Sequence, residues 1–235
     1  MATARALQAR TPLVPSTSMA LLGESEMGKA SKSLLRALAE SIQRRAVARA
    51  EAQTDEDYDQ EQADQDAMRG KEEEELQFNI SEVLGSILKT HGGRFLPAMT
   101  EDWLPRMAEL SHEACLIADR KLAAFIFCDV LEFCGEATAP VFGSLMPHLL
   151  LGIGSEEPTL RQPCAYGIGV AAAAAPGAFG STPFVEHALQ QLIQSTEKPG
   201  ARQGEQESAT GKIIKAAFLS PKCCHRFIFF SLVSR

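Results

Sequence analysis

Hydrophobic and polar positions follow a helical period through much of the chain. Over residues 31–53, large aliphatic side chains recur near helical spacing, and four arginines occupy other positions. This pattern predicts an amphipathic helix. Its apolar stripe needs a neighbour, so we expect this helix to pack on the part of the chain that begins after residue 75.

A second helix is predicted with a stronger signal from Phe78 to His91. Its aliphatic residues trace one face, and Asn79 and Glu82 have the spacing of an N-cap and an N3 carboxylate. The pair Gly92 and Gly93 is typical of a helix end.

Later segments repeat one arrangement, in which a helix begins near one proline and contains another. The internal prolines Pro105 and Pro147 lie 42 residues apart, and Leu189 of the last predicted helix lies 42 residues further on. A proline inside a helix removes a hydrogen bond, so we expect a kink or break at Pro105. A period of about 40–47 residues with two antiparallel helices is typical of HEAT or armadillo solenoids. We therefore predict an all-α fold, a HEAT-repeat solenoid of about three helical hairpins over residues 76–218.

Residues 54–75 concentrate the negative charge of the chain. They hold eleven carboxylates, one arginine and one lysine, a net charge of −9, against +4 for residues 1–53 and −2 for residues 76–235. Like charges repel and stay hydrated, so the composition predicts an acidic disordered insertion, a loop between the first two helices. The nearly neutral body offers no basic field for nucleic acid.

Two interpretations of this acidic loop stay open, a solubilising linker and a surface that attracts basic protein segments. Three of its aspartates have the spacing of a calcium loop, but glutamine and aspartate stand where that loop needs glycine and glutamate, so calcium is disfavoured. As candidate partner-binding residues we select Asp55, Glu56, Asp57, Tyr58, Asp59, Glu61, Asp64 and Asp66.

Trp103 is a further candidate partner-binding residue, because a lone tryptophan could line a groove that faces a partner. A core or rim position is the more usual place for such a side chain.

Catalytic and metal-binding patterns are missing from the sequence. The six cysteines form no CxxC pair and the five histidines are scattered, which disfavours zinc and catalysis and indicates a reduced, intracellular chain. The stretch GIGVAA at residues 167–172 approximates a dinucleotide fingerprint, but no strand precedes it, and glycines that permit close helix packing explain it better. We predict no enzymatic activity, no metal and no cofactor.

The two ends of the chain differ from its body. Residues 1–30 are predicted to be disordered or to resemble a transit peptide, because they contain arginines and no acid before Glu24. Residues 219–235 form an atypical C-terminal tail. No apolar run reaches the length needed to span a bilayer.

An ordered series of short segments resembles the later HEAT repeats of the importin-β superfamily (karyopherin-β) of nuclear import receptors, in the branch that contains importin five. The segments are QTDEDYDQEQADQ (53–65), ISEVLGSIL (80–88), RFLPAMTEDWLP (94–105), DRKLAAFIFCDVLEFC (119–134), LMPHLL (145–150), TLRQPCAYGIGV (159–170) and GKIIK (211–215). Pro163 departs from the pattern, and we expect a local distortion there.

The resemblance implies a superhelical carrier that binds protein cargo with basic localisation signals on its concave side. It also implies control by the Ran GTPase, contacts with Phe-Gly nucleoporins, and residence in the cytoplasm and nucleus, with no cofactor, nucleic acid or membrane partner. The alternative is a HEAT-repeat scaffold for protein–protein assembly without transport activity.

Overall fold

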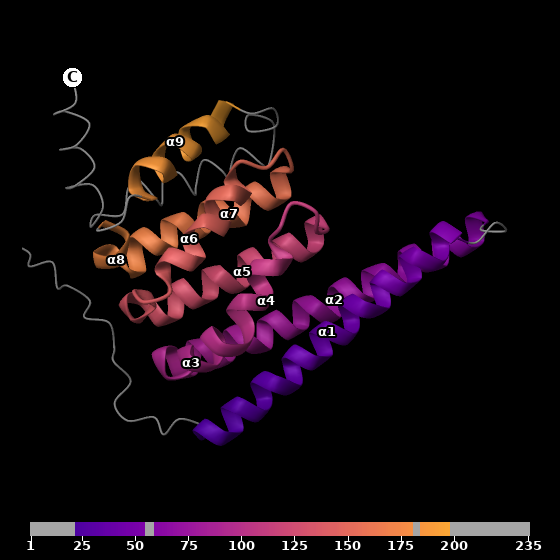
Figure 1. Cartoon of the computed structure of the whole chain (residues 1–235), viewed down its shortest axis with the longest axis horizontal. Helices are drawn as coiled ribbons and strands as arrows, with labels where there is room; N and C mark the ends of the chain where they lie inside the picture. Colours follow the sequence, from indigo (N-terminus) through magenta and orange to yellow (C-terminus); the bar gives the residue numbers. More distant parts are fainter. Residues whose placement is uncertain (1–21, 55–58, 181–183, 198–235) are drawn as a thin grey trace, which may run out of the picture.

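The structure is a computed structural model that describes residues 22–54, 59–180 and 184–197 (Figure 1). All regular secondary structure in these ranges is helical. The longer helices are α1 (Glu24–Thr54), α2 (Gln60–His91), α5 (Ile117–Cys134), α6 (Phe142–Ile153), α7 (Pro158–Ala174) and α9 (Phe184–Glu197). Shorter helices are α3 (Leu96–Ala98), α4 (Leu104–Leu110) and α8 (Pro176–Gly180), with 3₁₀ turns η1 (Gly92–Arg94) and η3 (Gly135–Thr138) and a π-helical turn, η2 (Met99–Trp103).

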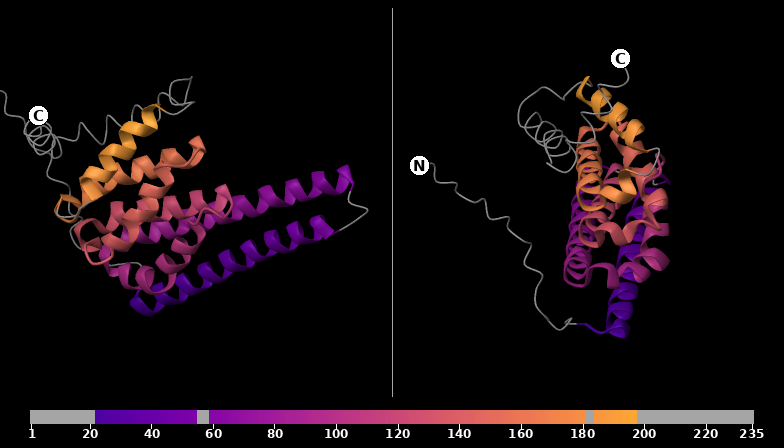
Figure 2. Two further views of the ribbon diagram at one scale, coloured as in Figure 1. Left: turned by 45° about the horizontal axis from the view of Figure 1, so that its top comes forward. Right: turned by 90° about the vertical axis from the view of Figure 1, so that its left-hand side faces the viewer.

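The helices pack in two layers (Figures 1 and 2). In one layer α5 lies between α2 and α7, and in the other α4 contacts α6, which contacts α9. Hairpins α1–α2, α4–α5 and α6–α7 connect the layers. Pro105, Pro147 and Leu189 all fall in the layer of α4, α6 and α9, so the 42-residue period marks equivalent helices of successive repeats. The predicted all-α HEAT-repeat solenoid is confirmed.

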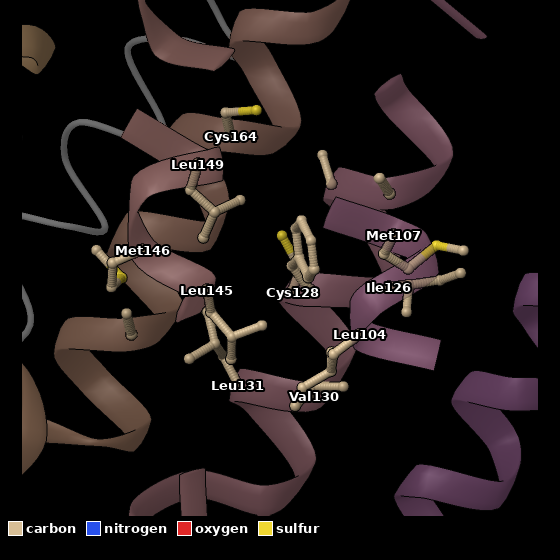
Figure 3. Close-up of a cluster of buried hydrophobic side chains, with 14 of the residues drawn as sticks. Leu104, Met107, Ile126, Cys128, Val130, Leu131, Leu145, Met146, Leu149 and Cys164 are labelled. Atoms are coloured by element: carbon tan, nitrogen blue, oxygen red, sulfur yellow. The ribbon is translucent and has the colours of Figure 1, made fainter. Parts of the chain in front are cut away.

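The core is a continuous apolar seam between the layers. In Figure 3, Leu131 of α5 lies beside Leu145 of α6, and Val130 of α5 lies beside Leu104 of α4. Met107 of α4 and Leu149 of α6 add to the same cluster. Each large aliphatic side chain that is fully buried contributes about 1.5–3 kcal/mol. Because every helix of the seam touches the next repeat, no hairpin could bury its apolar face alone.

Each of the helices α2, α5 and α7 has a buried polar side chain at an equivalent position of the repeat. In α5 and α7 this position is in the first turn, whereas in α2 it lies inside the helix. These are Gln77, Asp119 and Arg161, spaced 42 residues apart and all buried. Asp119 forms an ion pair with the buried Arg45 of α1. The Gln77 amide, with its oxygen toward Arg45, accepts hydrogen bonds from Arg45 Nε at 3.2 Å and Nη2 at 3.1 Å. Arg161 donates to two carbonyls of the preceding turn, at 3.0 and 2.7 Å. The repeats therefore share a polar anchoring position.

The acidic segment departs from the prediction. The expected loop over residues 54–75 is wrong from residue 60 onward, because α2 begins at Gln60 and continues without interruption to His91. The Asp59 carboxylate accepts from the Gln62 N–H at 2.9 Å, and the Gln62 side chain accepts from the Asp59 N–H at 2.8 Å, a capping box that starts the helix. Asp55–Tyr58 lie outside the described residues.

Helix α1 provides the physical reason for this difference. It runs beside the acidic half of α2 and forms with it a two-helix arm that projects past the other hairpins (Figure 1). Arg44 of α1 makes a bidentate pair with Glu73 of α2, with Nη2 to Oε2 at 2.8 Å. Most of the other carboxylates in the acidic half of α2 are exposed, and this half of the helix is rich in Glu and Gln, which are good helix formers.

The ends of the solenoid were predicted only in part. The predicted helix over residues 31–53 is confirmed, but α1 already begins at Glu24, so disorder as far as residue 30 is wrong for residues 24–30. The predicted solenoid residues 198–218 and the tail 219–235 lie outside the described residues. None of the described helices is both long enough and apolar enough to cross a bilayer.

The two prolines singled out in the sequence have different effects. Before Pro105 the helix widens into the π-turn η2, and Pro105 falls in the first turn of α4. The predicted kink or break is therefore observed as a π-helical turn within a helical segment that continues from Leu96 to Leu110. Proline has no N–H to donate to the carbonyl four residues earlier, which accounts for the irregular turn. Pro163, in contrast, does not interrupt α7. It is buried, and its carbonyl accepts a hydrogen bond from the Cys128 thiol at 3.4 Å.

Candidate protein-binding surface

Acidic and aromatic side chains gather on the exposed side of the layer formed by α2, α5 and α7. Phe125, Asp129 and Glu132 have the i, i+4, i+7 spacing that places them on one stripe of α5. Glu82 of α2 and Tyr166 of α7 flank this stripe, as their interactions with its carboxylates show. We call these five residues the acidic–aromatic face. Three successive repeats contribute to it.

Tyr166 is held in place by a carboxylate of the neighbouring repeat. Its hydroxyl donates to Glu132 Oε2 at 3.1 Å. Burial raises the pKa of Tyr166 to about 12, with further contributions from the negative charge of Glu132 and from this hydrogen bond. The hydroxyl therefore stays protonated at neutral pH, while the ring remains 44% exposed.

Asp129 lies in the middle of the face without a compensating charge. No hydrogen bond or ion pair joins its carboxylate to another described residue. Burial raises its pKa to about 6, and the negative charges of Glu132 and then Glu82 act in the same direction. A Cβ at Gly85 of α2 would lie 2.6 Å from Asp129 Oδ2, so this glycine lets the carboxylate approach the α2 backbone.

This arrangement is suited to a cation. A lysine or arginine side chain between the three carboxylates would relieve their mutual repulsion and stabilise the ionised form of Asp129. The exposed rings of Phe125 and Tyr166 offer faces for cation–π contact. Lys89 lies two turns after Glu82 on the same stripe of α2, and Lys121 lies one turn before Phe125 on the same stripe of α5. These positive charges limit the cation-attracting part of the face to the middle of the layer.

The described part of the chain has no comparable site for a metal ion. It contains no group of three or more His, Cys, Asp or Glu side chains placed to hold one. Cys115, Cys128, Cys134 and Cys164 are free thiols, and burial raises the pKa of three of them, which makes thiolate chemistry unfavourable at Cys128, Cys134 and Cys164.

The sequence of the chain is similar to known nuclear transport proteins. Residues 14–111 match the family described as importin repeat 6. The importin subunit beta-3 of Saccharomyces cerevisiae is 27% identical to this chain over 139 residues, which is 59% of the chain and 12% of that protein. These matches show that the chain is similar to proteins of the importin-β superfamily. It spans only about an eighth of the length of this curated relative.

Solved structures of a karyopherin have the same fold as this chain. Kap121p bound to the SUMO protease Ulp1p has a TM-score of 0.64 and 22% identity, over 87% of this chain and 17% of that chain. Kap121p bound to Ste12p has a TM-score of 0.62 and 22% identity, over 83% and 16% of the two chains. Kap121p bound to Pho4p has a TM-score of 0.60 and 20% identity, over 85% and 17%.

None of the described residues that were selected from the sequence belongs to this face. Asp59, Glu61, Asp64 and Asp66 lie at the start of α2, on the outer part of the arm. At 1.5 Å per residue, even Asp66 is about 24 Å along the helix from Glu82. The arm and the acidic–aromatic face are therefore two separate acidic regions of the chain.

Trp103 lies in the core, not on a groove. It is fully buried, and its Nε1 donates to Ser31 Oγ of α1 at 3.0 Å. The selection of Trp103 as a partner-binding residue is wrong, and its observed role is to join η2 to α1.

All five residues of the acidic–aromatic face were missed in the sequence. A usable signal was present in α5, where carboxylates and an aromatic ring share one stripe of an otherwise apolar helix. Glu82 and Tyr166 had no such signal, because only the packing of α2 and α7 against α5 brings them to the same patch.

Proposed function

We propose that this chain is part of a nuclear transport receptor and that its acidic–aromatic face binds an extended basic segment of a protein cargo. The half-buried, uncompensated carboxylate of Asp129 between Glu82 and Glu132 carries the proposal. A site that keeps a carboxylate in an unfavourable environment is a candidate for ligand binding, because a bound cation would remove the penalty.

The comparisons support a protein as the ligand. The related karyopherin Kap121p has been crystallised with Ulp1p, Ste12p and Pho4p, so this fold accommodates protein segments. On our proposal, import into the nucleus, residence in cytoplasm and nucleus, control by Ran and contact with Phe-Gly nucleoporins belong to the complete receptor. This chain corresponds to one section of the receptor's superhelix.

A fluorescent peptide of alternating lysine and glycine tests the proposal, with its anisotropy measured against the full chain at 150 mM salt. Removing the charges with Asp129→Asn and Glu132→Gln together should weaken binding about tenfold or more, equivalent to about 1.4 kcal/mol, because both contacts to the cation are lost. Phe125→Ala should weaken binding further by removing an exposed ring.

Glu109→Gln is the matched control. Glu109 is exposed on α4, in the other layer, where it pairs with Arg106 at 2.7 Å, and its replacement should leave the affinity unchanged. Equal affinity of the wild type and the double variant, or equal binding of an alternating glutamate–glycine peptide, would rule out the acidic–aromatic face as the cargo site. Separate pull-downs with Ran·GTP and with Phe-Gly repeats test the wider transport role.

A further inference from the structure

A recess lies between the α4–α5 turn and the α6–α7 turn. Figure 1 shows these two turns at one edge of the solenoid. It is open to solvent and has a volume of about 550 Å³. Ile117 and Leu151 provide its apolar wall, Glu113 and Glu156 lie on its lining, and Arg120 of α5 is its cationic group. We call it the Arg120 recess.

Arg120 is the unusual component of this recess. Its side chain is 9% exposed, and its Nε has no hydrogen-bond partner. No ion pair joins its guanidinium to any carboxylate of the described residues. A buried cation without a partner is unfavourable, so the position calls for an anion that the described part of the chain does not supply.

Neighbouring polar groups do not satisfy Arg120. Ser111 and His148 line, together with Arg120, a small cavity of about 10 Å³. Those two side chains bond to each other, with Ser111 Oγ and His148 Nδ1 at 2.7 Å. Glu157, on the lining of the recess, is engaged at the start of α7, where its carboxylate accepts from the Thr159 N–H at 3.2 Å and the Thr159 hydroxyl at 2.9 Å.

The backbone at this edge also favours an anion. Arg120 belongs to the first turn of α5, whose N-cap is Leu116, and no side chain caps this helix end. The first N–H groups of a helix and the positive end of its dipole attract negative charge. Helix α7, by contrast, has its N-terminus capped by Glu157. Both the guanidinium and the helix end thus favour an anion at the same place.

We propose that the Arg120 recess binds a carboxylate group of a protein partner, paired with the guanidinium of Arg120 at the start of α5. A planar carboxylate matches the fork of a guanidinium in two parallel hydrogen bonds. The recess also contains Glu113 and Glu156, which would repel a doubly charged phosphate more strongly than a single carboxylate. Ile117 and Leu151 fit the hydrocarbon part of the partner's residue.

This site is independent of the cargo proposal. The acidic–aromatic face attracts cations, and the Arg120 recess attracts an anion, so the two surfaces would recognise different groups. Loss of either activity in a test leaves the other proposal intact.

NMR of the arginine Nε–H groups in the full chain tests carboxylate binding directly. Sodium acetate, exchanged for sodium chloride at constant ionic strength, should shift the Arg120 Nε–H signal in a saturable way. The partner's carboxylate could come from an acidic side chain or from a C-terminus. N-acetylglutamate amide represents the side-chain carboxylate and N-acetylglycine the C-terminal carboxylate, and a saturable shift with either compound supports the proposal. No saturable shift with any of the three, or tighter binding of inorganic phosphate, would overturn it.

A stability measurement on two variants provides an independent check. Arg120→Met should raise the melting temperature of the free protein by a few degrees, because it removes an unpaired buried charge. Acetate should raise the melting temperature of the wild type, and this effect should be absent in Arg120→Met. Arg161→Met is the matched control, since Arg161 is equally buried but hydrogen-bonded, and it should lower the melting temperature. A lower melting temperature for Arg120→Met would mean that Arg120 has a partner within the chain, and would refute the proposed site.

Discussion

Asp129, a residue of the candidate binding surface, lowers the stability of the unbound protein. Its carboxylate has left bulk water for a position between two other acids, and Gly85 provides the space for it. Each unit of pKa shift corresponds to about 1.4 kcal/mol between the protonated and ionised forms. Because Asp129 is only half-buried, solvent screening reduces the penalty, and we expect about 1 kcal/mol at neutral pH.

Because ionised Asp129 destabilises the folded protein, Asp129→Asn should increase its stability, and the increase should depend on pH. The folded pKa of about 6 lies above the ordinary value of 3.8, so the folded state binds the proton more tightly and loses stability as the pH rises through this interval. Asp129→Asn should therefore raise the free energy of unfolding by about 1 kcal/mol at pH 7.5 and by almost nothing at pH 3.5. Urea denaturation at the two pH values measures this. An equal gain in the free energy of unfolding at pH 7.5 and at pH 3.5 would show that the gain does not come from removing the charge of Asp129.

At the scale of the helix, two glycines end equivalent elements in the same unusual conformation. Gly92 follows α2 with φ 53°, and Gly135 follows α5 with φ 51°. A Cβ at Gly92 would lie 3.3 Å from the carbonyl oxygen of Phe133, and a Cβ at Gly135 would lie 3.1 Å from that of Ala174. Each glycine therefore ends its own helix and also lets the end of the next repeat's helix approach.

Replacing either glycine should weaken the stack of repeats. Gly92→Ala and Gly135→Ala should each lower the free energy of unfolding by about 1–2 kcal/mol, the cost of a left-handed conformation for an L residue, with Gly135→Ala the more damaging because its carbonyl contact is closer. Thermal or urea denaturation gives the values.

Gly70→Ala is the matched control for these variants. Gly70 lies inside α2 with nothing within 4 Å of an added Cβ, so alanine there should stabilise the helix by about 0.5–1 kcal/mol. If all three substitutions had the same effect, the conformation at Gly92 and Gly135 would not be what matters.

The helices differ in how far the sequence alone could predict them. The helices of the body have apolar stripes that local periodicity reveals, and the 42-residue spacing of Pro105 and Pro147 gives the stacking order. The acidic half of α2 has no such stripe, and its helical state depends on α1, through contacts such as Arg44 with Glu73, which are 29 residues apart. A prediction of disorder from the local density of like charges takes no account of a partner that is so distant in the chain.

The same limit applies to both candidate binding surfaces. The acidic–aromatic face becomes visible only when α2, α5 and α7 are aligned, since Tyr166 meets Glu132 across 34 residues. Arg120 gives no signal in the sequence at all, because its lack of a partner is a property of the packed turns around it. Trp103 was prominent in the sequence because of its size, and the structure shows that this large side chain fills space in the core.

At the scale of the whole molecule, negative charge is divided between the arm and the acidic–aromatic face. Residues 54–75 carry a net charge of −9, against +4 for residues 1–53 and −2 for residues 76–235, so this segment contributes most of the field that attracts an approaching cation. Charges that do not touch a ligand chiefly change the rate of association, whereas contacting charges change the rate of dissociation. The two regions should therefore contribute to different rate constants for a basic ligand.

Neutralising each region separately distinguishes these contributions. With Asp59, Glu61, Asp64 and Asp66 changed to their amides, the association rate of the lysine–glycine peptide should fall several-fold at 20 mM salt and little at 150 mM, because the Debye length shortens to about 8 Å, while the dissociation rate stays the same. Asp129→Asn with Glu132→Gln should instead speed dissociation at both salt concentrations. Surface plasmon resonance or stopped-flow anisotropy measures both rates. Faster dissociation from the arm variant would place the bound peptide on the arm, which is the surface that the sequence first suggested.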